Sequence, residues 1–153
     1  MFTPEIIEFF NNRGFPATMG TTDNNLEPAI ARPFGVRVAG EDSLSVIIPE
    51  AFTTNTLKNI QQNGRIALTQ VSPVDHKTFQ FKGKYIEHHA STEEEMGFVG
   101  ENFMAFIEII QKFYGEQLAE KIKEKQITSF LTFTFKVEQI FNQTPGPGAG
   151  AKI

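Results

Sequence analysis

Basic and hydroxyl side chains gather in two neighbouring parts of the chain, where together they could bind an anion. The first part is the apolar segment Ala29 to Val38, which carries Arg32 and Arg37. The second is Pro49 to Leu68, PEAFTTNTLKNIQQNGRIAL, where a strand end runs into a short helix and then into another apolar strand. A phosphate group is bound by guanidinium groups, hydroxyls and free backbone N–H groups at a helix start. The sequence therefore predicts an anion-binding corner between these two segments.

The helix start in this corner is a run of small polar residues. Thr53, Thr54, Asn55 and Thr56 offer hydroxyls and candidate N-caps, and Asn63-Gly64 is a typical helix end. An ordinary helix cap explains the same run without any ligand, so both interpretations stay open.

The two arginines stand five residues apart, which places them on opposite faces of a regular strand. Both can reach one anion only if a bulge at Gly35 redirects one of them. Otherwise Arg32 is a surface charge, and Pro33-Phe34-Gly35 is an irregularity at a sheet edge.

Composition excludes several classes of protein. With 153 residues, 40% of them hydrophobic and 16 of them Phe, the chain can form a single domain around one core. A net charge of −4 argues against nucleic acid as a partner. The absence of Cys excludes disulfides, a thiolate nucleophile and Cys-ligated zinc. No signal peptide or membrane span is recognisable, so we expect a cytoplasmic protein without membrane contact.

Hydrophobic periodicity predicts a mainly β protein with peripheral helices. A short helix begins after the cap Thr3 and ends near Gly14. Ser91, three residues before Glu94, reads as a capping box that opens the longest helix, which breaks near Gly115 before a segment from Glu116 to Lys125. Strands are expected at 17–22, 27–38, 43–48, 65–71, 79–89 and 132–138. Short turns between them favour a closed or partly closed antiparallel barrel.

Other motifs carry little chemistry. His88-His89 could bind a metal, but neighbours on a strand point to opposite faces and no third ligand stands at a useful spacing. No nucleophile motif supports a hydrolase. The tail Thr144 to Gly150, TPGPGAG, is neither a dinucleotide fingerprint nor a phosphate loop, because it follows a strand. It suits an extended arm across a dimer interface, or else a frayed end.

The chain resembles the pyridoxamine 5′-phosphate oxidase-like, FMN-binding split β-barrel family. The resemblance covers most of the chain except the long helix, and the closest subgroup shares the TPGPGAG ending. It rests on the order and spacing of four pieces: the strand with Arg32 and Arg37, PEAFTTNTLKNIQQNGRIAL, TFQFKGKYIE, and VEQIFNQTPGPGAGAKI.

This resemblance implies a six-stranded antiparallel split β-barrel over residues 1–143, a Pro/Gly-rich C-terminal arm at 144–153, and a homodimer with FMN at its interface. The phosphate-binding strand falls on Arg32 to Arg37, and the partner-chain contact to the flavin falls on or next to Thr78. Together with Thr53 and Thr54 from the helix start, the predicted cofactor residues are Arg32, Pro33, Phe34, Val36, Arg37, Pro49, Glu50, Asn55, Thr56, Thr78 and Gln80.

Three functions follow as expectations. The first is an FMN-binding oxidoreductase-like protein that transfers hydride or electrons between a small-molecule substrate and a donor such as NAD(P)H. The second is a non-catalytic protein that binds flavin, haem or another small molecule in the same pocket. This gains weight because Asn55 and Thr56 are uncharged where the family's oxidases have basic residues. The third is a dimer whose pocket has decayed and whose role is structural.

Overall fold

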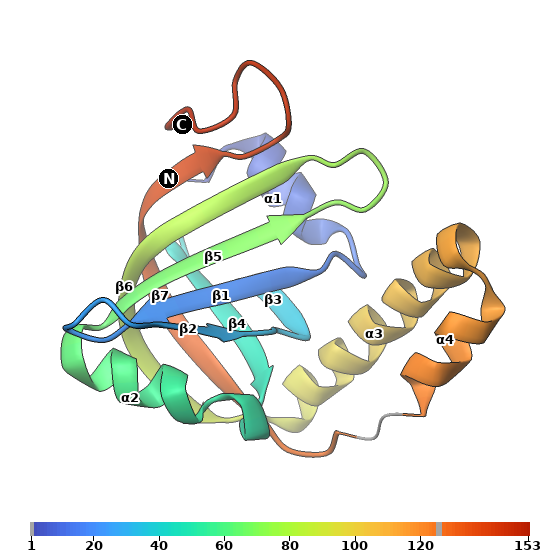
Figure 1. Ribbon diagram of the computed structural model, residues 1–153, viewed down its shortest axis with the longest axis horizontal. Coiled ribbons are helices and arrows are strands. Elements are labelled where there is room, and N and C mark those ends of the chain that lie inside the picture. Colours follow the sequence, from blue (N-terminus) through green and yellow to red (C-terminus); the bar gives the residue numbers. More distant parts are fainter. Residues whose placement is uncertain (1, 125–126) are drawn as a thin grey trace.

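Seven strands form one antiparallel sheet in the order β2-β1-β5-β6-β7-β4-β3. The computed structural model describes residues 2–124 and 127–153. The sheet curls strongly, and helices lie around it (Figure 1). The predicted fold class is therefore confirmed, with seven strands instead of six. The strands are β1 Ala17–Thr22, β2 Pro28–Ala31, β3 Gly35–Val38, β4 Ser43–Pro49, β5 Arg65–Val71, β6 Thr78–Ala90 and β7 Phe130–Asn142.

The two edge strands of the sheet are consecutive in the chain. Among the described residues, β2 pairs only with β1 and β3 only with β4, yet just Arg32, Pro33 and Phe34 join these two strands. A link of this length spans at most about 15 Å, so the sheet must curl until its two edges approach each other. The prediction of one continuous strand over 27–38 is wrong, because the chain changes from one edge of the sheet to the other at this link, the crossover. The irregularity lies at Arg32–Phe34 and not in a bulge at Gly35.

The core fills the inside of the curled sheet. Strand β4 is buried along most of its length, with Leu44, Val46 and Ile48 in the main core and Ile47 in a second cluster under a helix. Helix α1 (Pro4–Asn11) packs Phe9 and Phe10 against Phe79 and Phe81 of β6, with ring centroids 5.1 and 5.2 Å apart. Edge-to-face and tilted contacts at these distances are favourable for aromatic rings.

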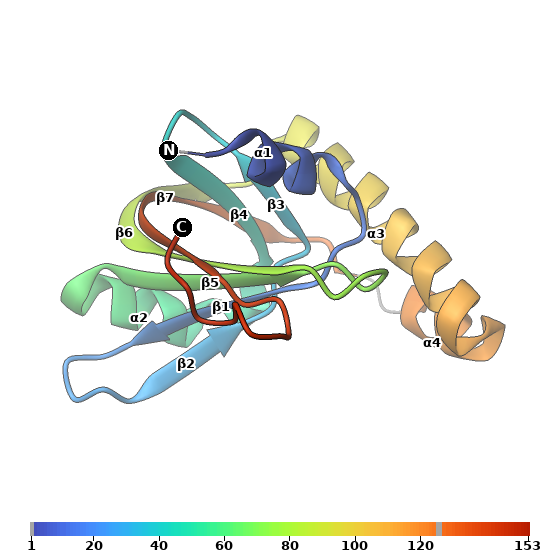
Figure 2. The same ribbon diagram turned by 90° about the horizontal axis from the view of Figure 1, so that it is seen from above.

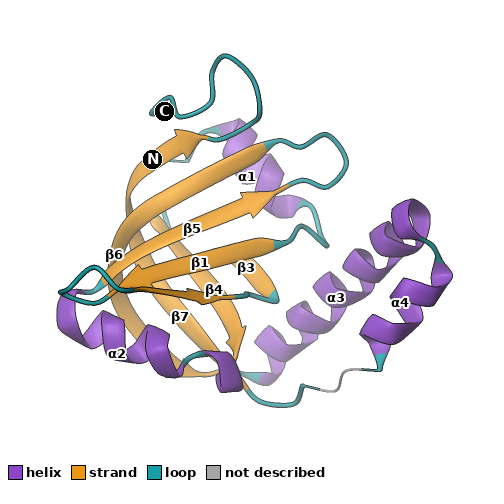
Figure 3. Cartoon of the chain, in the orientation of Figure 1, coloured by secondary structure: helices purple, strands orange, loops and turns teal. Residues whose placement is uncertain are grey.

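Further helices lie outside the sheet: one beside it, and two together as a hairpin. Helix α2 (Thr54–Asn63) follows the short 3-10 turn η1 (Glu50–Phe52) and ends, as predicted, at Gly64 in left-handed geometry. Helices α3 (Glu93–Tyr114) and α4 (Glu116–Lys123) form a hairpin that leans away from the sheet (Figures 2 and 3). The break at Gly115 is confirmed. Lys125, the predicted end of the second segment, lies outside the described residues.

The capping box of α3 stands one residue later than predicted. Thr92 accepts from the Glu95 N–H, and the Glu95 carboxylate accepts from the Thr92 N–H at 2.8 Å. The predicted pair, Ser91 and Glu94, does not form it, because the Ser91 hydroxyl is hydrogen-bonded to the hydroxyl of Thr132 on β7 at 2.9 Å. Within the described residues, no helix is both long and apolar enough to cross a lipid bilayer.

The C-terminal tail turns back onto its own chain. The Asn142 N–H donates to the Ala151 carbonyl at 2.9 Å, and the Ile153 N–H donates to the Ile140 carbonyl at 2.9 Å. Phe141 and Lys152 form an antiparallel bridge. The tail therefore lies beside the end of β7, in contrast to the extended arm that the prolines suggested.

Helix α3 rests directly on the backbone at Gly14, between α1 and β1. Gly14 has φ +78°, and a Cβ there would lie 2.6 Å from the backbone nitrogen of Phe106 and 2.7 Å from the carbonyl carbon of Ala105. Neither backbone atom can rotate away, so glycine is required for this close approach.

Gly14→Ala is expected to lower the free energy of unfolding by about 2–4 kcal/mol, through left-handed strain and overpacking. The matched control is Gly97→Ala on the same helix, where a Cβ meets nothing within 4 Å. It should raise stability by about 0.5–1 kcal/mol because alanine favours helix. Urea unfolding followed by circular dichroism measures both, and equal effects of the two substitutions would contradict the contact.

Candidate functional site

The start of α2 has no side-chain cap. Thr53 occupies the N-cap position and is buried, but its hydroxyl donates to the Glu50 carbonyl at 2.8 Å and accepts nothing from the helix. Thr54 and Asn55 are exposed, whereas Thr56 is buried. The N–H groups of the first helical turn therefore have no side-chain cap, and their binding of an anion stays a prediction.

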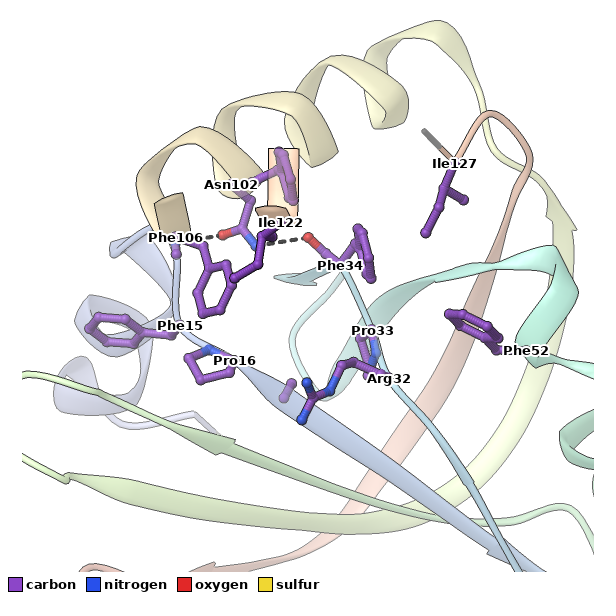
Figure 4. Close-up of a pocket in the computed structure, with 13 residues that line it drawn as sticks. Phe15, Pro16, Arg32, Pro33, Phe34, Phe52, Asn102, Phe106, Ile122 and Ile127 are labelled. Atoms are coloured by element: carbon purple, nitrogen blue, oxygen red, sulfur yellow. Dashed lines mark hydrogen bonds between the residues drawn. The ribbon is translucent and has the colours of Figure 1, made fainter. Parts of the chain in front are cut away.

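A cavity of about 330 Å³ lies beside the crossover, and none of Thr53, Thr54, Asn55 and Thr56 lines it. Arg32, Pro33 and Phe34 of the crossover line it together with Phe52, the residue directly before Thr53 (Figure 4). The two segments that the sequence singled out thus contribute to one cavity. The other lining residues are Gly14, Phe15, Pro16, Ala17, Asn102, Phe103, Phe106, Ile122 and Ile127.

Asn102 holds the crossover in place. Its amide oxygen accepts from the Gly14 N–H at 2.8 Å, and its amide nitrogen donates to the Phe34 carbonyl at 2.8 Å (Figure 4). The sequence analysis assigned no role to this residue. The signal was present: Asn102 lies three residues after Val99 and four before Phe106, on the inward face of α3, where a polar side chain requires partners.

Arg37 is engaged away from the cavity. Its guanidinium lies 3.0 Å from Glu94 and 3.3 Å from Glu95, both at the start of α3, and 5.8 Å from the ring centroid of Phe98. Arg32 is exposed and forms no ion pair with any residue that the structure describes. The structure therefore brings Arg32, but not Arg37, to the cavity, and the joint binding of one ligand by both stays a prediction.

Glu95 is the buried member of a charged cluster. Its carboxylate contacts Arg37 and lies 3.1 Å from the Nε2 atom of His89 on β6. Burial would raise the pKa of Glu95, but hydrogen bonds from the Thr92 N–H, the Thr132 hydroxyl and His89 outweigh it and lower that pKa below its ordinary value. The cluster joins β3, β6 and the start of α3. It includes Arg37, which the resemblance assigned to phosphate binding.

The remaining predicted cofactor residues lie apart from the cavity. Val36 is buried in the main core and Pro49 at the end of β4, while Glu50 accepts from the Ser129 hydroxyl. Gln80 donates to the Thr69 hydroxyl at 3.2 Å, and the Thr78 N–H donates to the Thr144 hydroxyl at 3.0 Å. Neither Thr78 nor Gln80 lines the cavity of its own chain. Their contact with a partner's ligand stays a prediction.

The adjacent histidines have separate partners. The His88 Nδ1 atom lies 2.7 Å from the Tyr85 hydroxyl, whereas His89 pairs with Glu95. In the part of the chain that the structure describes, no three potential metal ligands come together.

Comparison with models of protein families finds no match, and comparison with curated proteins finds none either. Several solved structures are similar. HupZ of Group A Streptococcus is 22% identical over 99% of both chains, with a TM-score of 0.57. A candidate pyridoxamine 5′-phosphate oxidase from Lactobacillus delbrueckii is 14% identical over 92% of this chain and 93% of that one, with a TM-score of 0.56. An FMN-binding protein from Syntrophomonas wolfei is 14% identical over 88% of this chain and 81% of that one, with a TM-score of 0.53.

These similarities establish the fold. The chain has the split β-barrel architecture of the pyridoxamine 5′-phosphate oxidase-like proteins, as its sequence predicted.

The Glu95 cluster predicts a specific acid sensitivity. A carboxyl whose pKa is lower in the folded chain than in the unfolded chain stabilises the fold at pH above its unfolded-state pKa. This stabilisation is lost as the pH falls through the folded-state pKa. Wild-type protein should therefore lose part of its stability as pH falls below the ordinary glutamate value of 4.5. Glu95→Gln should be less stable than wild type at pH 7, with the difference narrowing in acid.

Urea titrations between pH 3 and 7 measure this difference. Glu93→Gln, in the same helical turn but exposed, is the matched control and should follow wild type throughout. Asp75, whose pKa is lowered first by a hydrogen bond from the Ser72 side chain, is unchanged in both variants. A Glu95→Gln curve parallel to wild type at every pH would refute the assignment.

Proposed function

We propose that the corner formed by Arg32 and the start of α2 binds the phosphate of FMN, and that the chain acts in flavin-dependent hydride or electron transfer. The observation that carries this proposal is the shared cavity. It brings the crossover residues Arg32, Pro33 and Phe34 together with Phe52, directly before an uncapped helix start.

The residues present fit a phosphate monoester. Arg32 supplies a guanidinium whose planar donors suit phosphate oxygens. The first-turn N–H groups of α2 and the helix dipole favour negative charge, and exposed Thr54 and Asn55 add polar groups. When bound, FMN would supply the redox chemistry, while the protein would hold and orient it.

The proposed assembly is a homodimer in which each chain completes its partner's site. Thr78 and Gln80 stand on β6, away from the cavity of their own chain, so a contribution from them to the flavin requires a second copy. A small-molecule substrate and an electron donor such as NAD(P)H complete the proposed reaction. Among the similar structures, one is an FMN-binding protein and another an F420 reductase, which favours a flavin-like cofactor. A cytoplasmic location stays a prediction.

A second candidate function is binding without turnover, of a flavin, haem or another planar anion. The engagement of Arg37 by Glu94 and Glu95 favours it. With Asn55 and Thr56 uncharged, Arg32 is then the guanidinium left at the corner for a group that carries nearly two negative charges. Bleaching of bound flavin by NAD(P)H without oxygen would favour the oxidoreductase, and a lasting yellow colour under the same conditions would favour this second function.

Ligand-free protein titrated with FMN should quench flavin fluorescence, and riboflavin, which lacks the phosphate, should bind at least tenfold more weakly. Arg32→Ala should weaken FMN about tenfold, because it removes a charge-assisted contact at an exposed position, and should leave riboflavin unchanged. Arg65→Ala, an exposed arginine on β5, is the matched control and should have no effect. Equal affinities for FMN and riboflavin would rule out a phosphate site at this corner.

A further inference from the structure

The cavity beside Arg32 extends away from Phe52 and the start of α2. Its far part lies between the β1 start and the α3–α4 hairpin, where Phe15, Pro16, Phe106 and Ile122 form the walls (Figure 4). These residues are remote in sequence from the anion-binding corner, and neither the resemblance nor the proposed FMN contacts involve them. This part of the cavity therefore has no assigned role.

We propose that this part of the cavity binds a small aromatic monocarboxylate, with its ring among the phenylalanines and its carboxylate on Arg32. This proposal does not depend on the binding of FMN at the corner.

The walls favour a flat apolar body. Five phenylalanines line the cavity: Phe15, Phe34, Phe52, Phe103 and Phe106. Two of them, Phe34 and Phe103, are stacked with planes 1° apart and centroids 6.2 Å apart. Phe52 remains 51% exposed, so an apolar ligand beside it would remove aromatic surface from water.

The charge of the lining selects the polar group. Arg32 is the one charged residue among the lining residues that the structure describes, and no carboxylate faces it there. Asn102, the lining amide, already bonds Gly14 and Phe34. A single guanidinium in an apolar wall complements one anionic group, and its planar donors match a carboxylate. Because a guanidinium has five N–H donors, Arg32 can contact anions on both of its sides.

The size of the cavity sets the size of the ligand. A volume of about 330 Å³ lies at the small end of the range for ligand pockets. A bicyclic aromatic acid is small enough for a pocket of this size.

Calorimetric titration of the ligand-free full chain with 2-naphthoate tests the proposal, with the uncharged analogue 2-naphthalenemethanol beside it. Naphthoate should bind once per chain and about tenfold more tightly than the alcohol, because only the acid pairs with Arg32. Arg32→Gln, at an exposed position, should bring naphthoate to the affinity of the alcohol and leave the alcohol unchanged. Equal binding of acid and alcohol by wild type, or no binding of either, would overturn the proposal.

A second pair of variants locates the ligand. Ile122→Glu places a carboxylate in the cavity wall and should reduce naphthoate binding at least tenfold, since like charges repel. Gln117→Glu makes the same change of net charge on the same helix, at an exposed position outside the cavity, and should bind as wild type does. Equal losses in both variants would place the ligand elsewhere. Circular dichroism checks that each variant folds. If Ile122→Glu does not fold, the loss of naphthoate affinity in Arg32→Gln tests the proposal by itself.

The two proposals can fail separately. FMN titration of Ile122→Glu should give wild-type affinity, because Ile122 is not part of the phosphate corner. If the protein binds naphthoate but neither FMN nor riboflavin, the flavin proposal is wrong and the carboxylate proposal stands. If it binds FMN but not naphthoate, the carboxylate proposal is wrong and the flavin proposal stands.

Discussion

The short link between the two edges of the sheet determines most of this structure. β2 and β3 stand at opposite ends of the strand order, yet only Arg32, Pro33 and Phe34 separate them. A flat sheet of seven strands would be about 29 Å wide at its usual spacing, roughly twice the reach of the link. The sheet therefore has to curl. Because β2 and β3 do not pair with each other, the link itself joins the two edges at this point, and Asn102 of α3 is hydrogen-bonded to it.

The same link explains why chemistry concentrates here. Backbone that leaves one strand edge for another lacks a continuous ladder, so its remaining polar groups need other partners; the Phe34 N–H still donates to the Ile47 carbonyl of β4 at 2.8 Å. Asn102 supplies one of them through the Phe34 carbonyl, and its second bond, to Gly14, ties the link to the segment before β1. Arg32 lies on the cavity side of the link. Arg37, on β3 beyond the link, reaches the acids at the start of α3. Two arginines of one segment thus face different environments.

Local patterns in the sequence were sufficient for most elements of the fold. Thr3 caps α1, Gly64 ends α2, Gly115 separates α3 from α4, and alternation located the strands. The break at Arg32–Phe34 could not be read locally, because an Arg-Pro-Phe-Gly sequence is equally compatible with a bulge within one strand. The capping box was displaced by a contact between Ser91 and Thr132, which are 41 residues apart. For the site, Arg32 and the helix start were predictable by residue type. The engagement of Arg37 and the role of Asn102 depend on the packing of α3, which no local pattern encodes.

The tail beside β7 affects whether another copy of the chain can pair with this edge of the sheet. β4 pairs with β7 only as far as Lys136, so the end of β7 would otherwise present unpaired backbone groups. Such an edge is a template on which a strand of another molecule can add, and it is a common origin of aggregation. The bonds from Asn142 to Ala151 and from Ile153 to Ile140 fill this edge from within the same chain. The glycines and prolines of the tail, which are poor strand formers, allow the turn that brings the last residues there. The tail thus occupies backbone groups at the end of β7 that a strand of another molecule would otherwise bind.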